Sequence, residues 1–325
     1  MEVDISTKYA GLNLKSPIIV GACSLTSNLE NIIEISQRGA GAVVLKSIFE
    51  EEITNEYSNI LQEAQKRGID DENLDYLDLK IKHQNVDSYL NLIKQAKKRV
   101  EIPIIASINC VSPFEWSFYA KKIEEAGADA IELNIFALPI DFERTSQQIE
   151  EIYFKIINEA QKSTKIPVIV KLSSYFTNLG KTIVDISKTG VKGLVFFNRF
   201  YNNDIDIYTK KVTTSEIFSR PSDYTLPMRW IAMTSGRVEC SLAASTGVHT
   251  TETLLKMIFA GANAVQVVSS IYLNGYQLIE KINKEIIDFM NNNDYEALSQ
   301  MIGIASQRNI KNPVVYERFQ FMKYF

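Results

Sequence analysis

One short unit recurs along this chain: a glycine turn, a brief apolar run, and a polar residue where the run stops. In its fullest form Gly127 follows a helix, Ala130 to Leu133 form the apolar run, and Asn134 ends it. Glycine suits the left-handed turn after a helix, and such runs are typical of buried parallel strands. The unit is repeated at residues 39–46, 190–198 and 261–270. The chain is therefore constrained to an α/β fold with parallel strands.

Eight such strands alternate with segments of helical periodicity, which predicts a TIM (β/α)8 barrel. The predicted strands are 18–21, the run ending at Lys46, 104–109, 130–133, 168–171, the run ending at Asn198, 240–244, and the run ending at Ser269-Ser270. We expect a single domain over residues 1–325. Its additions are an N-terminal hairpin at 5–17, insertions at about 49–80 and 201–227, and a helical, aromatic C-terminal tail at about 294–325.

Composition excludes several classes of protein. A net charge of -4 does not indicate the basic surface that is typical of nucleic-acid-binding proteins. No apolar run approaches the ~20 residues of a membrane helix, and residues 1–10 are not a signal peptide, so we expect a cytoplasmic protein. Three widely spaced cysteines and two histidines predict no disulfide framework, no metal site and no iron–sulfur cluster in this chain.

Polar groups at the strand ends indicate where chemistry takes place, since barrel enzymes keep their active sites at the carboxyl ends of the strands. Lys46 and Lys171 each follow a buried run, and a buried ammonium needs a partner. That partner could be a phosphate or a flavin, or either lysine could form a Schiff base. Asn109, Asn134 and Asn198 add amides, which suit the C=O and N–H edges of a planar heterocycle.

The last two strand ends have the composition of an anion site. Ser245-Thr246-Gly247 and Ser269-Ser270 offer hydroxyls and backbone N–H groups just before a helix begins. Barrels commonly bind phosphate in the loops after strands seven and eight. The alternative is ordinary helix capping without a ligand.

Taken together, several segments resemble the dihydroorotate dehydrogenase family of flavoproteins, in matching order along nearly the whole chain. They are residues 39–47, 126–134, 166–172, Asn198, 226–229, 246–248 and 261–270. The resemblance implies an FMN-binding barrel of the soluble, class 1 type. The positions that it implies for contact with FMN are Ala22, Lys46, Ser47, Asn134, Lys171, Thr246, Gly247, Ser269 and Ser270. It implies contact with orotate for Lys46, Asn134 and Asn198.

The sequence departs from the family pattern where the family keeps its catalytic base. After Asn134 the family places a Cys or Ser that removes a proton from dihydroorotate, and here Phe136 and Ala137 follow, which cannot. Cys110 is our candidate for the base, and the other candidates are Cys23, Ser173, Ser174 and Tyr175. Ser219-Arg220 stands where the family has Ser-Gly, and Val268-Ser269-Ser270 stands where a Gly-Thr pair is usual.

We therefore predict an FMN-dependent oxidoreductase that oxidises dihydroorotate to orotate, in pyrimidine biosynthesis, or acts on a related CH–CH substrate. The alternatives are a Schiff-base lyase using Lys171 or Lys46, and a flavin-binding subunit without dihydroorotate activity. The expected partners are an orotate-like small molecule, an electron acceptor that is a molecule or a protein, and a second copy of the chain in a homodimer.

Overall fold

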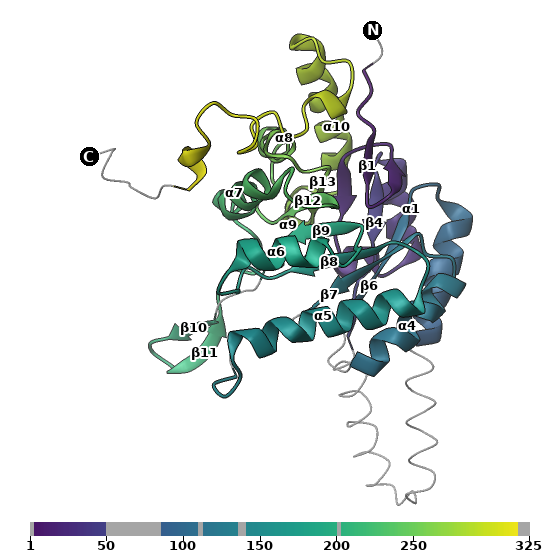
Figure 1. Ribbon diagram of the computed structural model, residues 1–325. Coiled ribbons are helices and arrows are strands. Elements are labelled where there is room, and N and C mark those ends of the chain that lie inside the picture. The colour runs from purple at the N-terminus through teal and green to yellow at the C-terminus, as the bar shows by residue number, and fades with distance from the viewer. Residues whose placement is uncertain (1–2, 50–85, 110–112, 136–140, 200–202, 318–325) are drawn as a thin grey trace, which may run out of the picture.

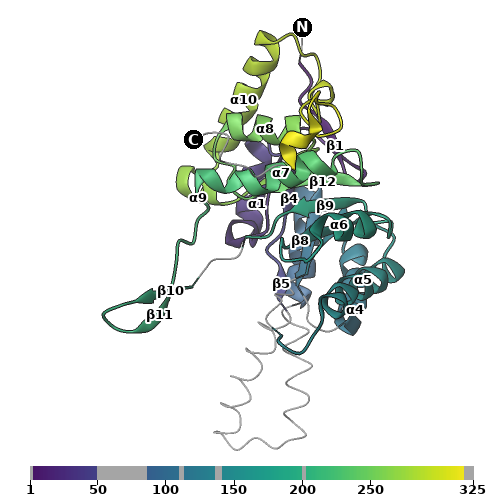
Figure 2. The same ribbon diagram turned by 60° about the vertical axis from the view of Figure 1, so that its left-hand side comes forward.

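The fold is a closed barrel of parallel strands surrounded by helices (Figures 1 and 2). The computed structural model of the chain describes residues 3–49, 86–109, 113–135, 141–199 and 203–317. In these ranges eight parallel strands form the barrel: β3 (Ile18–Val20), β4 (Ala42–Val44), β6 (Ile104–Asn109), β7 (Ala130–Asn134), β8 (Val168–Leu172), β9 (Gly193–Phe196), β12 (Ser241–Ser245) and β13 (Ala264–Val267). Each pairs with its neighbours in chain order, and β4 also pairs with β6, while β13 pairs with β3, which closes the ring. The predicted barrel is confirmed.

Helices follow most of the strands and cover the outside of the ring. They are α1 (Leu29–Gln37), an unlabelled helix at 86–99, α4 (Pro113–Glu125), α5 (Ser146–Ser163), α6 (Leu179–Ser187), α7 (Thr225–Thr234), α8 (Thr251–Ala260), α9 (Ser269–Asn274) and α10 (Gln277–Asn292). Several begin at a side chain that accepts a hydrogen bond from the first turn: Asn28, Thr145, Asn178 and Thr250. Such caps satisfy backbone N–H groups that have no partner inside the helix.

The N-terminal hairpin closes one end of the barrel. Strands β1 (Thr7–Tyr9) and β2 (Leu12–Leu14) pair in antiparallel fashion around Ala10 and Gly11, whose φ angles are 51° and 83°. Tight hairpins favour such left-handed turn residues. Tyr9, fully buried, packs with the inward-facing side chains of the strands, so the predicted hairpin is a plug for the amino ends of the strands. The hairpin thus lies opposite the carboxyl ends of the strands, where barrel enzymes keep their active sites.

The excursion predicted at 201–227 contains a second antiparallel hairpin, β10 (Asn203–Asp206) and β11 (Lys211–Thr214). It stands away from the barrel in both ribbon views (Figures 1 and 2). The chain then returns through a 3-10 helix, η2 (Pro221–Tyr224), to α7. The insertion predicted at 49–80 lies almost entirely outside the described residues. Just before it, strand β5 (Ile48–Phe49) pairs with β6.

The C-terminal tail differs from the helical segment that the sequence predicts. Up to residue 317 its helical parts are two short 3-10 helices, η3 (Leu298–Gln300) and η4 (Pro313–Tyr316). The physical reason is that the tail's backbone bonds to the barrel: Ala305 N–H donates to the carbonyl of Phe259, and Gln307 N–H to that of Ala232. Gly303, at φ 79°, and Pro313 also interrupt any continuous helix.

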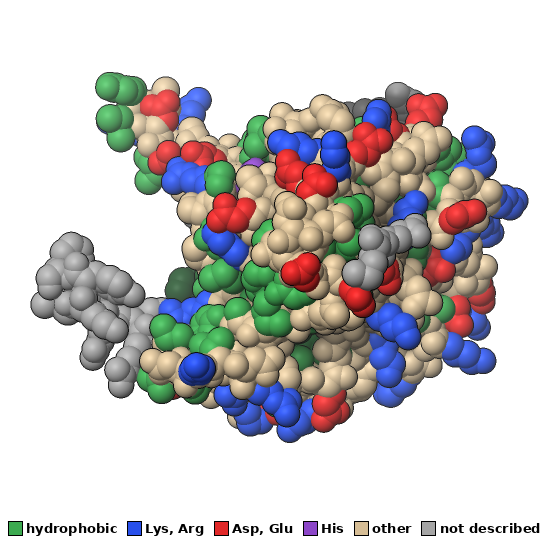
Figure 3. All heavy atoms as spheres, turned by 90° about the horizontal axis from the view of Figure 1, so that it is seen from above, with side chains coloured by type: hydrophobic (Ala, Val, Ile, Leu, Met, Phe, Trp, Pro, Cys, Tyr) green, Lys and Arg blue, Asp and Glu red, His purple; other side chains and the backbone are tan. Residues whose placement is uncertain are grey.

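Two observations describe the helices and one face of the described part of the chain. In the described part of the chain, none of the helices combines the length and apolarity needed to cross a bilayer. The face on the side of α10 mixes basic and acidic side chains, without an extended patch of one sign (Figure 3). This mixture agrees with the small net charge of -4.

Candidate functional site

The barrel interior changes from apolar to polar toward the rim. Near the plugged end the inward-facing side chains are buried and apolar, including Ile105, Ala130, Ile169, Val195 and Ala264. Because inward-facing residues alternate along a strand, the next inward residue lies two positions on. On five strands that residue is polar and no more than 8% exposed: Ser107, Glu132, Lys171, Ser245 and Gln266. A polar layer therefore lies directly beneath the rim.

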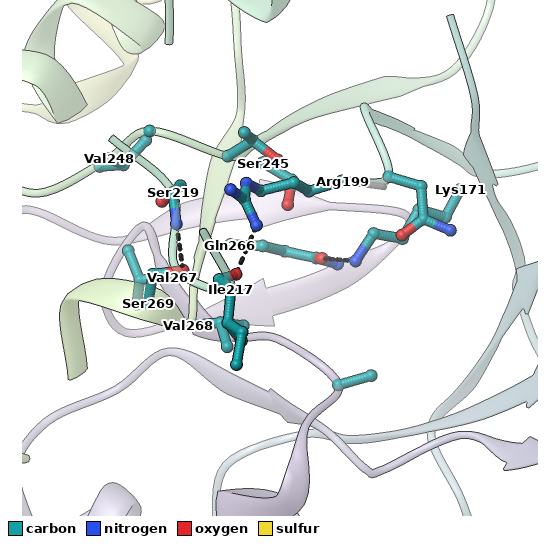
Figure 4. A pocket seen from close by; sticks show the side chains of 14 residues that line it. Lys171, Arg199, Ile217, Ser219, Ser245, Val248, Gln266, Val267, Val268 and Ser269 are labelled. Atoms are coloured by element: carbon teal, nitrogen blue, oxygen red, sulfur yellow. Dashed lines mark hydrogen bonds between the residues drawn. The ribbon is translucent and has the colours of Figure 1, made fainter. Parts of the chain in front are cut away.

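Three members of this layer form a buried network across the barrel. The Lys171 ammonium donates to Gln266 Oε1 at 3.0 Å (Figure 4). Gln266 Nε2 in turn donates to Glu132 Oε2, and Glu132 Oε1 lies 3.9 Å from Lys171 Nζ. Burial raises the pKa of the Glu132 carboxyl, and Lys171 and Gln266 oppose that shift. The partner that a buried Lys171 requires is thus supplied by the protein itself.

Our sequence interpretation missed Glu132 and Gln266. Each lies within a run counted as a strand because of its apolar neighbours, residues 130–133 and 264–268. The signal was the alternation within the strand, which points both side chains inward, as it does for Asn134 and Lys171. A polar residue at an inward position of a buried strand lowers the stability of the fold unless it is paired. Such a residue therefore indicates a partner inside the barrel.

Two predicted amides meet at the rim. Asn134 ends β7 and Asn198 follows β9, 64 residues later. Asn198 Nδ2 donates to Asn134 Oδ1 at 2.6 Å, and both residues are half-buried. The barrel therefore brings these two side chains together beside Lys171, which lies opposite Asn134 where β7 pairs with β8.

A cavity of about 200 Å³ opens between the rim and the loops after β12 and β13 (Figure 4). At its wall, Thr246 and Gly247 have φ angles of 81° and 76°. A Cβ at Gly247 would lie 2.2 Å from the backbone nitrogen of Tyr224, so only glycine fits there. The predicted cofactor residues that line this cavity are Ala22, Lys171, Thr246, Gly247 and Ser269.

Ser270 lies next to this cavity as the second residue of α9. Its hydroxyl is buried, and within the described ranges it has no hydrogen-bond partner. Buried polar atoms without a partner are rare in folded proteins. The Ser270 hydroxyl is therefore a group that a bound anion could satisfy.

One side of the cavity is closed by residues 216–219, which we call the strap. Arg199 holds the strap through its guanidinium, which donates to the carbonyls of Glu216, Ile217 and Phe218. Ser219 is held by two further contacts: its N–H donates to Ser269 Oγ at 3.0 Å, and its hydroxyl lies 2.9 Å from His249 Nε2. No motif in the sequence marks Arg199, apart from its position directly after Asn198.

The other candidates are distributed as follows. Lys46, half-buried, follows β4, and the Ser47 hydroxyl shares a 2.7 Å hydrogen bond with that of Ser107. Cys110 lies outside the described residues, as do residues 136–139 of the altered loop. Cys240 precedes β12 at the plugged end, where burial raises its pKa to about 12.

The histidine beside the strap predicts a pH dependence of stability. Burial lowers the pKa of His249 from its usual 6.5, so the unfolded chain binds this proton more readily than the folded protein. The free energy of unfolding should therefore fall as the pH drops below 6.5 through the lowered pKa. Urea unfolding from pH 8 to about 5 should show a flatter profile for His249→Gln. His83→Gln, which changes the only other histidine in the sequence, is the control. Equal slopes in wild type and His249→Gln would contradict this assignment.

Comparison with known proteins identifies the family. The profile described as dihydroorotate dehydrogenase matches residues 4–290. The chain belongs to the dihydroorotate dehydrogenase family. A relative named dihydroorotate dehydrogenase B (NAD(+)), catalytic subunit, from Thermoplasma volcanium is 28% identical, covering 94% of this chain and 99% of its own. A relative of the same name from Methanocaldococcus jannaschii is 26% identical, and the match covers 94% of this chain and 99% of the relative.

A solved structure supports the fold. Dihydroorotate dehydrogenase from Eimeria tenella, in complex with ferulenol, superposes with a TM-score of 0.65 at 15% identity, covering 93% of this chain and 88% of that one. As a member of the dihydroorotate dehydrogenase family, the chain is an FMN-dependent oxidoreductase that acts on a CH–CH bond. The resemblance, the barrel, the reaction class and the cofactor expected from the sequence are confirmed.

The residues present fit FMN. The cavity of about 200 Å³ adjoins a second of about 740 Å³, and the two share Asn198, Arg199 and Thr246 in their walls. Ligand sites usually measure roughly 300–1,000 Å³. The smaller cavity offers hydroxyls and backbone N–H groups for a phosphate, and beside it lies the Ser270 hydroxyl, which has no hydrogen-bond partner among the described residues. Lys171 and the amide pair supply donors and acceptors for the edge of a flat heterocycle.

Proposed function

We propose that the rim binds FMN and oxidises dihydroorotate itself to orotate. The observation that carries this proposal is the meeting of the Asn134–Asn198 pair with Lys171 at one rim, beside the small-residue cavity. The names of the relatives, which are dihydroorotate dehydrogenases, support the same substrate. In this proposal one domain spans the chain and FMN is held by Ala22, Lys46, Ser47, Asn134, Lys171, Thr246, Gly247, Ser269 and Ser270.

The roles of these residues follow from their chemistry. Thr246, Gly247, Ser269 and Ser270 hold the phosphate through hydroxyl and N–H groups, and the left-handed backbone at 246–247 shapes that corner. Lys171 faces the ring edge with a positive charge that Gln266 keeps in place. When bound, FMN accepts the hydride that leaves the substrate.

The substrate is held by neutral and cationic groups. The amides of Asn134 and Asn198 can pair with the C=O and N–H edges of a cyclic imide, and they keep this capacity at every pH. Lys46 supplies a cation for a carboxylate. Oxidation of the C–C bond also needs a proton acceptor, which we assign to Cys110, since Phe136 and Ala137 cannot take a proton.

The relatives' names also suggest the partners. Because they are called catalytic subunits, we propose that electrons leave the flavin for a partner protein or a small acceptor. We further propose a homodimer in the cytoplasm. The lyase alternative is not favoured, because a Schiff-base lysine needs its nitrogen accessible to a carbonyl carbon, whereas the Lys171 Nζ atom bonds to Gln266 beside a buried carboxyl.

Anaerobic mixing of the FMN-loaded protein with dihydroorotate tests the substrate. We expect the visible absorbance of the oxidised flavin to bleach and orotate to form. In Asn198→Leu the rate constant of bleaching should fall by about two- to tenfold, because one substrate hydrogen bond contributes about 0.5–1.5 kcal/mol. A flavin that stays oxidised with dihydroorotate, yet is reduced by dithionite, would show that dihydroorotate is not the substrate.

A further inference from the structure

An acid to which the mechanism above gives no role lies in the barrel interior, beneath the residues that line the cavity. Glu132 is fully buried within the barrel, and its Oε1 atom has no hydrogen-bond partner in the described part of the chain. A carboxyl in this position lowers stability unless something compensates for its burial. Its neighbours are the two other polar groups of the network, Gln266 and Lys171.

The geometry gives Gln266 a fixed orientation. Its carbonyl oxygen faces the Lys171 ammonium at 3.0 Å, while its NH₂ group faces Glu132. An amide can meet both demands in one orientation only, because an ammonium needs an acceptor and a carboxylate needs a donor. Glu132 therefore determines which end of Gln266 points at Lys171, although the carboxyl is not among the residues that line the cavity.

The network also places the Lys171 side chain between the cavity and the Glu132 carboxyl. Lys171 lines the cavity, and Glu132 Oε1 lies 3.9 Å from its Nζ atom, farther than Gln266 Oε1. The bridging amide thus keeps the ammonium from direct contact with the carboxyl. Without the bridge, the nearest remaining acceptor in the network would be Glu132, and the ammonium would move toward it and away from the cavity.

We propose that Glu132 is a positioning residue that acts through Gln266 to hold the Lys171 ammonium at the cavity floor and to set the reduction potential of bound FMN. This inference rests on the proposed binding of FMN at the rim. A flavin gains electrons on reduction, so a nearby buried negative charge opposes reduction and a nearby positive charge favours it. The two charges are close together in a site of low dielectric constant, where each has a large effect.

Two substitutions should move the potential in opposite directions. Glu132→Gln removes the negative charge and keeps an oxygen for Gln266, so the midpoint potential of the flavin should rise. Gln266→Met removes the bridge at similar volume and lets the ammonium approach Glu132, so the potential should fall and FMN should bind less tightly. A simple loss of packing would not produce shifts of opposite sign.

The experiment is a spectroscopic redox titration of the FMN-loaded wild type and both variants against reference dyes. Glu124→Gln is the matched control, because Glu124 bonds to Thr164 and Lys165 at the plugged end of the barrel. Its potential should equal that of wild type. If Glu132→Gln does not fold, Gln266→Met alone still decides the question by the sign of its shift.

The outcomes separate this inference from the proposed function. Opposite shifts in the two variants support the network. Wild-type potentials in folded variants that carry FMN would overturn the role of Glu132 and leave FMN binding intact. A wild-type protein that takes up no FMN would overturn both.

Discussion

Replacing Lys171 by methionine is expected to abolish retention of FMN and to lower the free energy of unfolding by about 3–5 kcal/mol. Lys171 is 7% exposed, and its ammonium donates to Gln266 and lies 3.9 Å from Glu132. Methionine has a similar length but cannot donate, so Gln266 loses a partner and Glu132 is left without its nearby cation. Leaving one member of a buried pair unpaired costs more than the pair itself contributes. Urea unfolding and a fluorescence titration with FMN measure the two effects.

Two controls make this result specific. Lys188→Met changes an exposed lysine after α6 and should stay within about 0.5 kcal/mol of wild type. Adding Glu132→Gln to Lys171→Met should recover part of the lost stability, because no unpaired acid remains in the barrel. A Lys171→Met protein with the stability and FMN affinity of wild type would show that the network has neither role.

Replacing Gly247 by alanine should have the second large effect, at the phosphate corner. The new Cβ would lie 2.2 Å from the backbone nitrogen of Tyr224, and backbone cannot move aside as a flexible side chain can. Overpacking of this kind costs about 1–3 kcal/mol. The left-handed φ of 76° adds about 1–2 kcal/mol for a residue with a Cβ. We expect the loop to shift and the affinity for FMN to fall with the stability.

Gly127→Ala is the matched control for this substitution. Gly127 also has a left-handed backbone, at φ 94°, but nothing lies within 4 Å of the position of its Cβ. It should therefore show only the backbone cost of about 1–2 kcal/mol and normal binding of FMN. Equal losses in the two variants, measured by urea unfolding, would mean that the approach of Tyr224 to Gly247 is unimportant.

The sequence predicted the parts of the fold that repeat. Short apolar runs that follow a glycine or a proline and end at a polar residue located the barrel strands, and they placed Asn134 and Asn198 at one rim, where the structure joins them. A strand pattern is local, and eight repeats of it admit few architectures. Helix starts such as Thr250 are local in the same way, because a cap depends on neighbouring residues.

The features that the sequence did not predict depend on contacts between distant segments. Arg199 holds residues 216–218, and the tail bonds to α7 and α8 instead of forming a regular helix. The periodicity of apolar residues in a sequence contains no information on such contacts. Glu132 and Gln266 were missed for a different reason: their apolar neighbours dominated each run, although the inward positions of the two residues could be read from the alternation.

The central claim is that the carboxyl ends of the barrel strands bind FMN, with the phosphate at Thr246, Gly247, Ser269 and Ser270 and the ring against Lys171. Equilibrium titration of flavin-free protein with FMN, and with riboflavin in parallel, tests it most directly. We predict saturable quenching of FMN fluorescence and weaker binding of riboflavin, which lacks the phosphate. FMN fluorescence that stays unchanged at every protein concentration would contradict the claim.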